Sequence, residues 1–536
     1  MSFLDNDSIC KKFKIFIDTC SLIDGKFEDF FADIKSDLLK NDNRIIIPYG
    51  VIAELDKHQK QATKENLKEK AKNVLKIIQK YLNKNKYIKV MGEENEKFAD
   101  NVFQTVFTKF RLEYNLLLIT QDKNLAKTIL SLKNNPSVQY VKEIEVLRIN
   151  NKGKLEQFNW NEQTSSLTTR SIDGFRLCTT VTKISDNPIR LKHIPKENDT
   201  ISSKKNGKIK LIKRLGGGGE GDVYRTNTPY IAKIYKQGKL TLRKQKKLEL
   251  MVTKDISFNG ICYPVDLLYE NNEFVGYLMP EAKGEVLQTS IFIKPRMMEL
   301  FPNWKKRDLV EVAVEILKKI KYLHDRNIIL GDINPMNIQI VSSKEIYFVD
   351  TDSYQIEDFP CPVGTVNYTA PELQGKKYED YLRTFGNEYF AVATLLFMLM
   401  LPGKTPYAQQ GGGSPMENIR GMDFPYPFGG TKGGVPEGPW RYCWSHLTYE
   451  IKKAFYETFM KWENVPLELK NNTEKSVQNH ASEKSRYDVA KWLGMFQRYK
   501  CLLDSGKFGE QDHMSEEIFP TRFKSISQDK YSNSYS

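Results

Sequence analysis

The sequence predicts a multidomain protein in which an α/β domain with a parallel sheet precedes an α+β domain that is first strand-rich and then helical. At about 150 residues per domain, 536 residues exceed a single core and suggest roughly three or four domains. In residues 1–150 the apolar runs KIFID, RIIIP and LLLIT alternate with helical stretches such as residues 65–81, as in a parallel sheet. From Ile209 a strand, a glycine-rich turn and a second strand follow one another, and the sequence becomes helical after Trp304.

Changes in composition predict the domain boundaries. Residues 1–150 form the first domain, and residues 151–207, rich in Asn, Ser and Thr, form a polar and basic connector. The second domain has its strand-rich part in residues 208–303 and its helical part in residues 304–499. We expect residues 500–536, which end in SISQDKYSNSYS, to be a disordered tail.

Composition excludes several classes of protein. Hydrophobic residues make up 40% of the chain and charged residues 28%, which excludes a wholly disordered protein. No apolar run reaches the ~20 residues of a membrane helix, and the first residues lack the pattern of a signal peptide. Seven dispersed cysteines without a CxxC motif argue against a disulfide framework and a zinc site. We therefore expect a cytoplasmic protein with no membrane partner.

Positive charge is concentrated in the middle of the chain. The net charge is +14, and residues 151–250 hold 22 Lys or Arg against 9 Asp or Glu. Such a segment can bind nucleic-acid phosphates through counterion release, or it can be a solvated surface. Lysines at every fourth position from residue 60 to residue 84 leave the same choice open, between a solvated helix and a track for an RNA backbone.

Four acidic residues stand at positions that a parallel sheet would bring together. Asp18 follows the run KIFI, Glu54 begins a helix after RIIIPYGVIA, Asp100 begins a helical stretch, and Asp122 follows LLLIT. Residues just past the carboxyl ends of parallel strands converge on one crevice. Four carboxylates there would repel one another without a hard cation, so we expect Mg²⁺ or Mn²⁺, which can activate water for attack on a phosphodiester. Any single acid could instead be a helix N-cap.

The motifs around these acids are DTCSLID, VIAELDK, ADNVF and TQDKNLA, and in this order they resemble those of PIN-domain nucleases. The resemblance covers nearly the whole first domain. It implies an Mg²⁺- or Mn²⁺-dependent endonuclease acting on single-stranded RNA. It also implies that Asp18, Glu54, Asp100 and Asp122 bind the metal, that Asp18 is catalytic, and that Thr19 assists through its hydroxyl. PIN relatives often dimerise, so a homodimer through this domain is possible.

A second group of residues has the chemistry of phosphoryl transfer. The segment LGGGGEGDV fits G-x-G-x-x-G-x-V between two apolar strands, and a lysine in IAKIY is placed to bind phosphates. Further on, LGDINPMN and IYFVDTD supply one acid as a base and two groups for magnesium. These residues are Gly216, Gly218, Gly221, Val223, Lys233, Asp332, Asn337 and Asp350.

Residues 209–499 resemble a eukaryotic-like serine/threonine protein kinase of a divergent bacterial group with GD-x-N-x-x-N and VDTDS motifs. The resemblance implies ATP and Mg²⁺ as cofactors and a protein as substrate. Asp332 would accept or orient the proton of the substrate hydroxyl, and Asn337 and Asp350 would hold Mg²⁺. The residues implied to contact or support ATP are Gly216, Gly218, Gly221, Val223, Lys233, its ion-pair partner Glu249, the hinge residues Met279 and Glu281, and Asn337.

The resemblance extends to the segment after the magnesium-binding acid, with clear departures. Glu372 of the APE motif would pair with Arg486, and Thr365 matches the threonine of serine/threonine kinases. Leu-Gly replaces His-Arg before Asp332, Asn334 replaces a lysine, and D-F-G reads D-T-D. Glu388 supplies the acid of the long apolar helix. The missing arginine and the short segment predict constitutive activity or another form of control, and the retained phosphate- and metal-handling residues favour an active kinase.

Together the two resemblances predict a bifunctional enzyme, an endoribonuclease joined to a serine/threonine kinase, that suits bacterial stress response or phage defence. The alternative is a signalling scaffold, in which a pseudokinase binds ATP without transfer and the first domain binds RNA without cutting it. A nuclease that acts on DNA is a third possibility. Transfer of labelled phosphate from ATP separates enzyme from scaffold, and RNA and DNA oligonucleotides separate the two nucleases.

Overall fold

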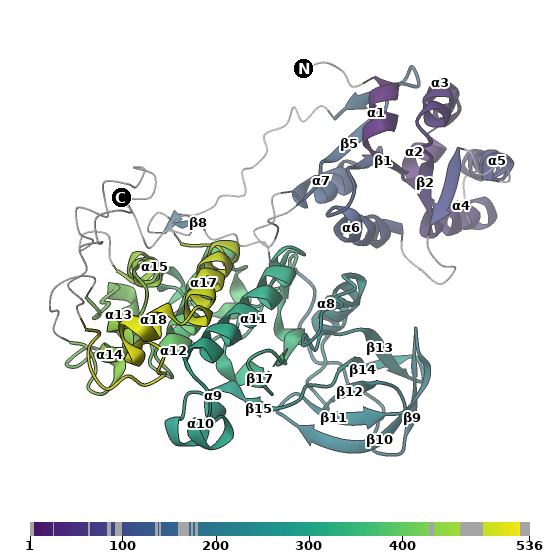
Figure 1. Cartoon of the computed structure of the whole chain (residues 1–536). Coiled ribbons are helices and arrows are strands. Elements are labelled where there is room, and N and C mark those ends of the chain that lie inside the picture. Colours follow the sequence, from purple (N-terminus) through teal and green to yellow (C-terminus); the bar gives the residue numbers. More distant parts are fainter. Residues whose placement is uncertain are drawn as a thin grey trace. The chain divides into compact units, whose positions relative to one another are not determined.

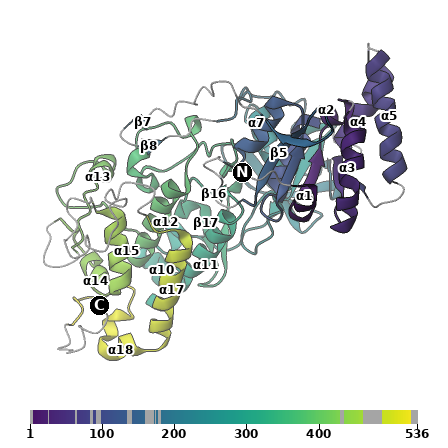
Figure 2. The same ribbon diagram turned by 90° about the horizontal axis from the view of Figure 1, so that it is seen from above.

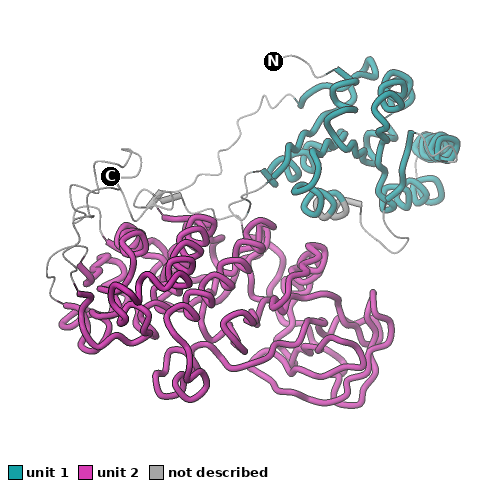
Figure 3. Tube along the Cα trace, in the orientation of Figure 1, with its two compact units in different colours: residues 1–168 teal, residues 169–536 magenta. Residues whose placement is uncertain are grey.

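The chain, shown as a computed structural model in Figure 1, forms two compact units, residues 1–168 and residues 169–536 (Figure 3). We describe each unit by itself. The structure describes the following residues: 5–24, 26–62, 65–82, 87–91, 99–133, 138, 141–158, 171–172, 175–176, 181–427, 434–460 and 486–525.

The first unit is built on a six-stranded sheet of order β3-β2-β1-β4-β5-β6. All neighbours are parallel except β5 and β6, so the predicted parallel α/β sheet is confirmed with one antiparallel edge strand. All four residues of β4 are buried, which means that both faces of the sheet are covered. The strands are β1 (Lys14–Ile17), β2 (Ile45–Pro48), β3 (Ile88–Met91), β4 (Leu116–Ile119), β5 (Ile144–Ile149) and β6 (Leu155–Gln157).

Helices connect these strands and flank the sheet. In Figure 2, α3 and α4 lie on one side of β5 and α7 lies on the other. Residues Phe27, Phe30, Phe31 and Ile34 recur at helical spacing and are buried, which explains why this segment forms a helix against the sheet. The helices are α1 (Asn6–Lys12), α2 (Thr19–Ile23), α3 (Phe27–Lys40), α4 (Tyr49–Gln61), α5 (Glu65–Leu82), α6 (Ala99–Phe110) and α7 (Lys123–Ser131).

The second unit begins with a closed barrel of order β10-β11-β12-β14-β13-β9, with one helix inserted between β12 and β13. Residues 231–235 of β12 are all buried, and the polar Lys233 is among them. The elements are β9 (Thr200–Ser203), β10 (Gly207–Gly217), β11 (Gly221–Thr226), β12 (Tyr230–Tyr235), α8 (Leu242–Thr253), β13 (Asp266–Glu270) and β14 (Glu273–Pro280).

The remainder of the second unit is largely helical. Helix α12 is buried along its whole length, because its sequence, FGNEYFAVATLLFMLM, has no polar face. The helices are α9 (Leu287–Ser290), α10 (Lys294–Leu300), α11 (Lys306–His324), α12 (Phe385–Met400), α13 (Pro415–Gly421), α14 (Trp440–Ser445), α15 (Tyr449–Phe459), α17 (Val489–Asp504) and α18 (Lys507–Gln511). Short strands are β15 (Glu285–Val286), β16 (Ile328–Ile329), β17 (Ile338–Ile340), β18 (Ile346–Phe348) and β19 (Gln355–Ile356), besides β7 (Ser171–Ile172) and β8 (Phe175–Arg176). Among the residues described, no helix combines the length and the apolar character needed to span a membrane.

The connector predicted for residues 151–207 is shorter in the structure. At its start, β6 extends the first sheet and Phe158 packs into the first core. At its end, β9 closes the barrel, and the backbone N–H of Ile189 donates to the carbonyl oxygen of Leu240 at 2.8 Å. The sequence did not predict that these segments pack against the two domains, because they are mostly polar and only scattered residues such as Leu191 are buried.

The disordered tail predicted from residue 500 also differs from the structure. Helix α17 continues to Asp504, α18 follows, and Ile518 lies in the core. The backbone N–H of Lys306 donates to the carbonyl oxygen of Glu516 at 2.8 Å. Spaced apolar residues were too few to predict this packing from sequence, and residues 526–536 lie outside the described part.

This C-terminal segment predicts a pH dependence of stability through His446. The buried ring contacts the Ser515 hydroxyl at 2.9 Å and the Arg522 carbonyl oxygen at 3.1 Å, and burial lowers the pKa of His446 to about 4. Because the folded pKa lies below the usual value of 6.5, stability is complete above pH 6.5 and declines as the pH falls toward 4. We expect a loss of about 3 kcal/mol over this range, at about 1.4 kcal/mol per unit of pKa difference, measured as unfolding of the second unit. His446→Gln should reduce the dependence of the free energy of unfolding on pH between 6.5 and 4. An unchanged dependence in this variant would show that another group is responsible.

Candidate active sites

In the first unit, the strand order reverses beside β1, so that the carboxyl ends of β1 and β4 lie next to each other. Asp18 directly follows β1 and is 4% exposed. Its carboxylate accepts hydrogen bonds from the Ser21 N–H at 2.7 Å and from the Thr120 hydroxyl. Burial raises the pKa of Asp18, and the nearby charge of Asp122 adds to this shift. Among the described residues, no cationic side chain forms a salt bridge with Asp18.

Thr120 connects two of the predicted acids. Its hydroxyl donates to Asp18 and accepts from the Asp122 N–H at 3.0 Å. The Asp122 carboxylate caps α7 by accepting from the N–H groups of Asn124 and Leu125 at 2.6 and 3.2 Å. The sequence analysis missed Thr120, although a polar residue directly after the buried run LLLI was an available signal.

The third predicted acid, Glu54, lies on α4 and accepts a hydrogen bond from the Thr19 hydroxyl. Thr120 thus links Asp18 with Asp122, and Thr19, the residue after Asp18, contacts Glu54. Asp100 lies on α6, and its side chain falls outside the described part. Among described residues there is no group of three or more His, Cys, Asp or Glu side chains that could hold a metal. The four-acid metal site therefore stays a prediction, although a buried carboxylate beside a second one suits a hard cation.

In the second unit, the glycine-rich turn joins β10 and β11. A Cβ at Gly221 would lie 2.5 Å from the Ile234 carbonyl oxygen, so packing against β12 requires glycine there. A Cβ at Gly216 or Gly218 would meet no protein atom within 4 Å, so packing does not require these glycines; they suit a backbone that closely approaches a ligand. Val223 on β11 is the cross-strand partner of Lys233 on β12, which fixes the turn next to this lysine.

Lys233 does not pair with Glu249, and that prediction is wrong. Its ammonium lies 2.9 and 2.8 Å from the two carboxylate oxygens of Asp352 and 3.2 Å from Oδ1 of Asp350. Glu249 instead bonds to Gln245 and Lys246 on its own helix, at 3.0 and 2.7 Å. The reason is the orientation of α8, which buries Lys247 against the carbonyl oxygens of Ser353 and Pro360 and leaves Glu249 half-buried along its own helix.

The loop of residues 332–337, called the catalytic loop below, places the predicted base Asp332 among polar partners. Asp332 Oδ1 accepts from the Thr365 hydroxyl at 3.2 Å, and Oδ2 accepts from the Asn337 amide at 3.4 Å. The Asn334 amide donates to the Thr365 hydroxyl at 3.1 Å. Burial raises the pKa of Asp332, and these hydrogen bonds oppose the shift.

Asp350 links the catalytic loop to Lys233. The N–H of the preceding residue donates to the Asn337 carbonyl oxygen at 2.9 Å, so Asn337 lies beside the segment that leads from β18 to Asp350. Asp350 has a left-handed backbone (φ 55°), which aspartate tolerates and which often marks functional sites. Burial and then the charge of Asp352 raise its pKa. The oxygen donors of Asp350 and Asn337 suit Mg²⁺.

Comparisons with known proteins agree with this geometry. A PIN domain model matches residues 15–141, and a protein kinase domain model matches residues 209–425. The chain joins a PIN domain to a protein kinase domain. This confirms both resemblances and the predicted two-part architecture.

Relatives of the kinase domain carry serine/threonine kinase names. The putative serine/threonine-protein kinase R436 of Acanthamoeba polyphaga mimivirus is 29% identical over 18% of this chain and 37% of its own length. PknD of Chlamydia abortus is 24% identical over 38% of this chain and 25% of its own, and human Sgk2 is 26% identical over 42% and 58%. The chain therefore spans between a quarter and three-fifths of these relatives.

Two buried acids, Glu388 and Glu372, connect segments of the kinase domain that are far apart in the sequence. Glu388 on α12 accepts from the N–H groups of Leu330 and Gly331, both at 2.7 Å, and contacts His324 Nε2 at 2.9 Å, so it anchors the loop before Asp332. The predicted pair of Glu372 and Arg486 is confirmed as a two-bond contact at 2.7 and 2.8 Å.

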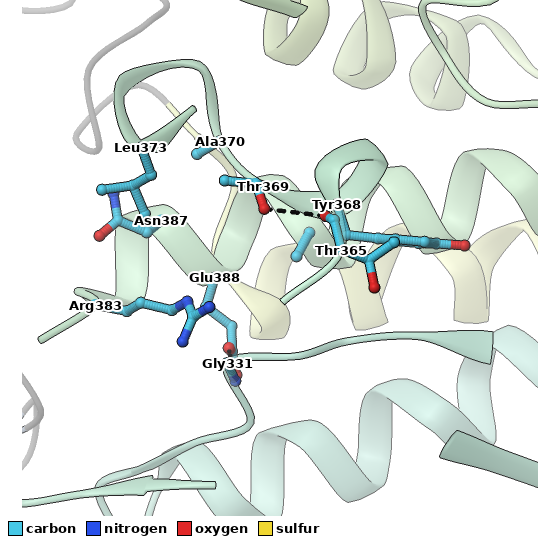
Figure 4. A pocket seen from close by; sticks show the side chains of 10 residues that line it. Gly331, Thr365, Tyr368, Thr369, Ala370, Leu373, Arg383, Asn387 and Glu388 are labelled. Atoms are coloured by element: carbon cyan, nitrogen blue, oxygen red, sulfur yellow. Dashed lines mark hydrogen bonds between the residues drawn. The ribbon is translucent and has the colours of Figure 1, made fainter. Parts of the chain in front are cut away.

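Arg383 is a residue that the sequence analysis missed. Its guanidinium donates to the carbonyl oxygens of Cys361 and Val363 at 2.8 and 2.7 Å and is buried. A Cβ at Gly331 would lie 3.0 Å from Arg383 Nη1, so Arg383 fills space beside the position of the missing arginine. Both residues line a cavity with Thr365 and Glu388 (Figure 4). No local motif pointed to Arg383.

The hinge residues lie at the end of β14. Met279 pairs with Ile231 of β12, and the Glu281 carboxylate accepts from Arg225 Nη2 at 2.8 Å. The side chain of Glu281 is thus engaged within the protein, and a contact of this segment with adenine stays a prediction.

Proposed function

We propose that the chain is a bifunctional enzyme, an ATP-dependent serine/threonine protein kinase fused to an Mg²⁺- or Mn²⁺-dependent endoribonuclease. The observation that carries the kinase assignment is the contact of Lys233 with Asp350 beside a catalytic loop in which Asn337 and Thr365 contact Asp332. The names of the relatives support serine or threonine as the acceptor.

In the kinase reaction, Asp332 orients the substrate hydroxyl toward the γ-phosphorus of ATP and receives its proton as the bond to ADP breaks. Thr365 and Asn337 fix the Asp332 carboxylate, and Lys233 binds the α- and β-phosphates. Asn337 and Asp350 are the side chains that would hold Mg²⁺, which when bound neutralises charge on the phosphates. Gly216, Gly218 and Gly221 would let the backbone cover those phosphates.

In the PIN domain, Asp18, Glu54 and Asp122, together with Asp100, would hold the divalent cation, which activates water for attack on the RNA backbone. Thr19 and Thr120 orient the carboxylates of Glu54 and Asp18. We further propose single-stranded RNA as substrate, a homodimer through this domain, cytoplasmic location, and a role in stress response or phage defence.

Incubation of the purified full chain with γ-labelled ATP, Mg²⁺ and a generic protein substrate tests the kinase assignment. We expect label on serine or threonine, lost on chelation with EDTA. ATP binding without transfer would support the alternative, a scaffold with a pseudokinase.

Asp18→Asn is expected to reduce metal-dependent RNA cleavage by at least about 10²-fold, because it removes a charged metal ligand. Asparagine is also a good N-cap, so α2 and the fold should persist. Cleavage of a labelled single-stranded RNA in Mn²⁺ measures the effect. The matched control is Asp24→Asn, an exposed acid at the other end of α2. Cleavage at the wild-type rate by the Asp18 variant would refute the metal placement.

A further inference from the structure

Helix α8 presents a cation, not an acid, to the interior of the kinase domain. Lys247 is 6% exposed, and its ammonium donates to the carbonyl oxygens of Ser353 at 2.8 Å and Pro360 at 3.3 Å. The side chain of Glu249 is 30% exposed and bonds within its own helix. An acid from this helix therefore does not reach the phosphate-binding lysine.

Asp352 is the buried acid that forms an ion pair with Lys233. Its side chain is 6% exposed, both carboxylate oxygens contact Lys233, and Oδ2 accepts from the Tyr235 hydroxyl at 2.9 Å. Burial alone would raise the pKa of Asp352, but the charge and hydrogen bonds of Lys233, with Tyr235, outweigh burial and lower it. A buried charge is tolerated only when it is paired in this way.

The charges in this region are balanced without the helix acid. Lys233 forms ion pairs with Asp350 and Asp352, and Lys247 lies near Asp352 and binds the backbone on its C-terminal side. The Thr351 hydroxyl donates to the Cys262 carbonyl oxygen at 2.8 Å and holds the same turn from another side. The turn that carries Asp352 is therefore fixed independently of a bound nucleotide.

We propose that Asp352 is the positioning residue of Lys233, and that Lys247 secures the turn carrying Asp352. The inference rests on the proposed kinase function. Its consequence is that the loop ending β18, and not α8, orients the phosphate-binding lysine. Because α8 holds no partner of Lys233, movement of α8 would act on the site indirectly, through Lys247 and through Lys244, whose ammonium bonds to Glu220 of the glycine-rich turn.

The test compares Asp352→Asn, Tyr235→Phe and the control Glu249→Gln in the full chain. For Asp352→Asn we expect kcat to fall about 10²-fold, the loss typical of a misplaced catalytic group. We expect the KM for ATP to change less than about threefold, because the other nucleotide contacts remain. Tyr235→Phe, which keeps the ring and removes one donor to Asp352, should lower kcat in the same direction. Glu249→Gln should stay within about twofold of wild type.

A second readout does not depend on kinase activity. Acetylation of Lys233 by acetic anhydride, quantified by mass spectrometry without nucleotide, should increase at least about threefold in Asp352→Asn, because the amine loses its charged partner. Glu249→Gln should leave it unchanged. The inference is overturned if Glu249→Gln, and not Asp352→Asn or Tyr235→Phe, increases labelling. If wild-type protein transfers no phosphate but the labelling pattern is as expected, the proposed kinase function fails while the pairing stands.

Discussion

Asp332→Asn is expected to reduce phosphoryl transfer by about 10²–10⁴-fold, the range for loss of a general base. Asparagine has nearly the same shape as aspartate and can still accept from the Thr365 hydroxyl, so the loop should keep its structure. It cannot take the proton of the substrate hydroxyl. Initial rates of label transfer from γ-labelled ATP measure the effect.

The control for this prediction is Asp325→Asn. Asp325 ends α11 a few residues before the catalytic loop, and its partly exposed carboxylate bonds to Lys321. We expect wild-type transfer from this variant. Transfer by Asp332→Asn within a few-fold of wild type would show that another group acts as the base.

The second large effect concerns the stability of the kinase domain. Arg486→Met is expected to destabilise it by about 3–5 kcal/mol, the cost of leaving one partner of a buried ion pair uncompensated. The Glu372 carboxylate, 4% exposed, would lose both of its hydrogen bonds to the guanidinium. The Gly386 carbonyl oxygen would lose a donor as well. Calorimetry of the full chain should show a lowered transition for the kinase domain and an unchanged one for the PIN domain.

Arg498→Met is the matched control. It breaks the exposed pair of Arg498 with Glu450, whose side chains are 60% and 45% exposed, and it should cost less than about 1 kcal/mol. Equal destabilisation by the two variants would contradict the view that the buried pair anchors the segment after the catalytic loop.

Local sequence patterns predicted the parts of the site whose position follows from strand ends and short motifs. Asp18 and Asp122 follow adjacent parallel strands, so sheet topology alone brought them close. Asp332, Asn337 and Thr365 meet because they lie on one tight loop and the segment facing it. The pairing of Glu372 with Arg486 was predictable because each lies in a recognisable motif.

Other parts could not be predicted because they depend on which way a side chain faces. On α8, Lys247 and Glu249 are two residues apart and lie on nearly opposite faces, about 200° around the helix, so the packing of α8 and not the local sequence decides which one is buried. In the sequence, Asp352 stands where the D-F-G motif has glycine, which gives no sign of a role. Only the contact with Lys233 in the structure indicates one. Arg383 bonds to backbone carbonyls, which leave no trace in the sequence.

The most direct test of two separate active sites in one chain uses the wild type, Asp18→Asn and Asp332→Asn. Each protein is incubated with γ-labelled ATP, Mn²⁺ and a short labelled single-stranded RNA, and both products are quantified. We expect the wild type to cleave RNA and transfer phosphate, Asp18→Asn to lose only cleavage, and Asp332→Asn to lose only transfer. Retention of both activities in both variants, or neither activity in the wild type, would contradict this account.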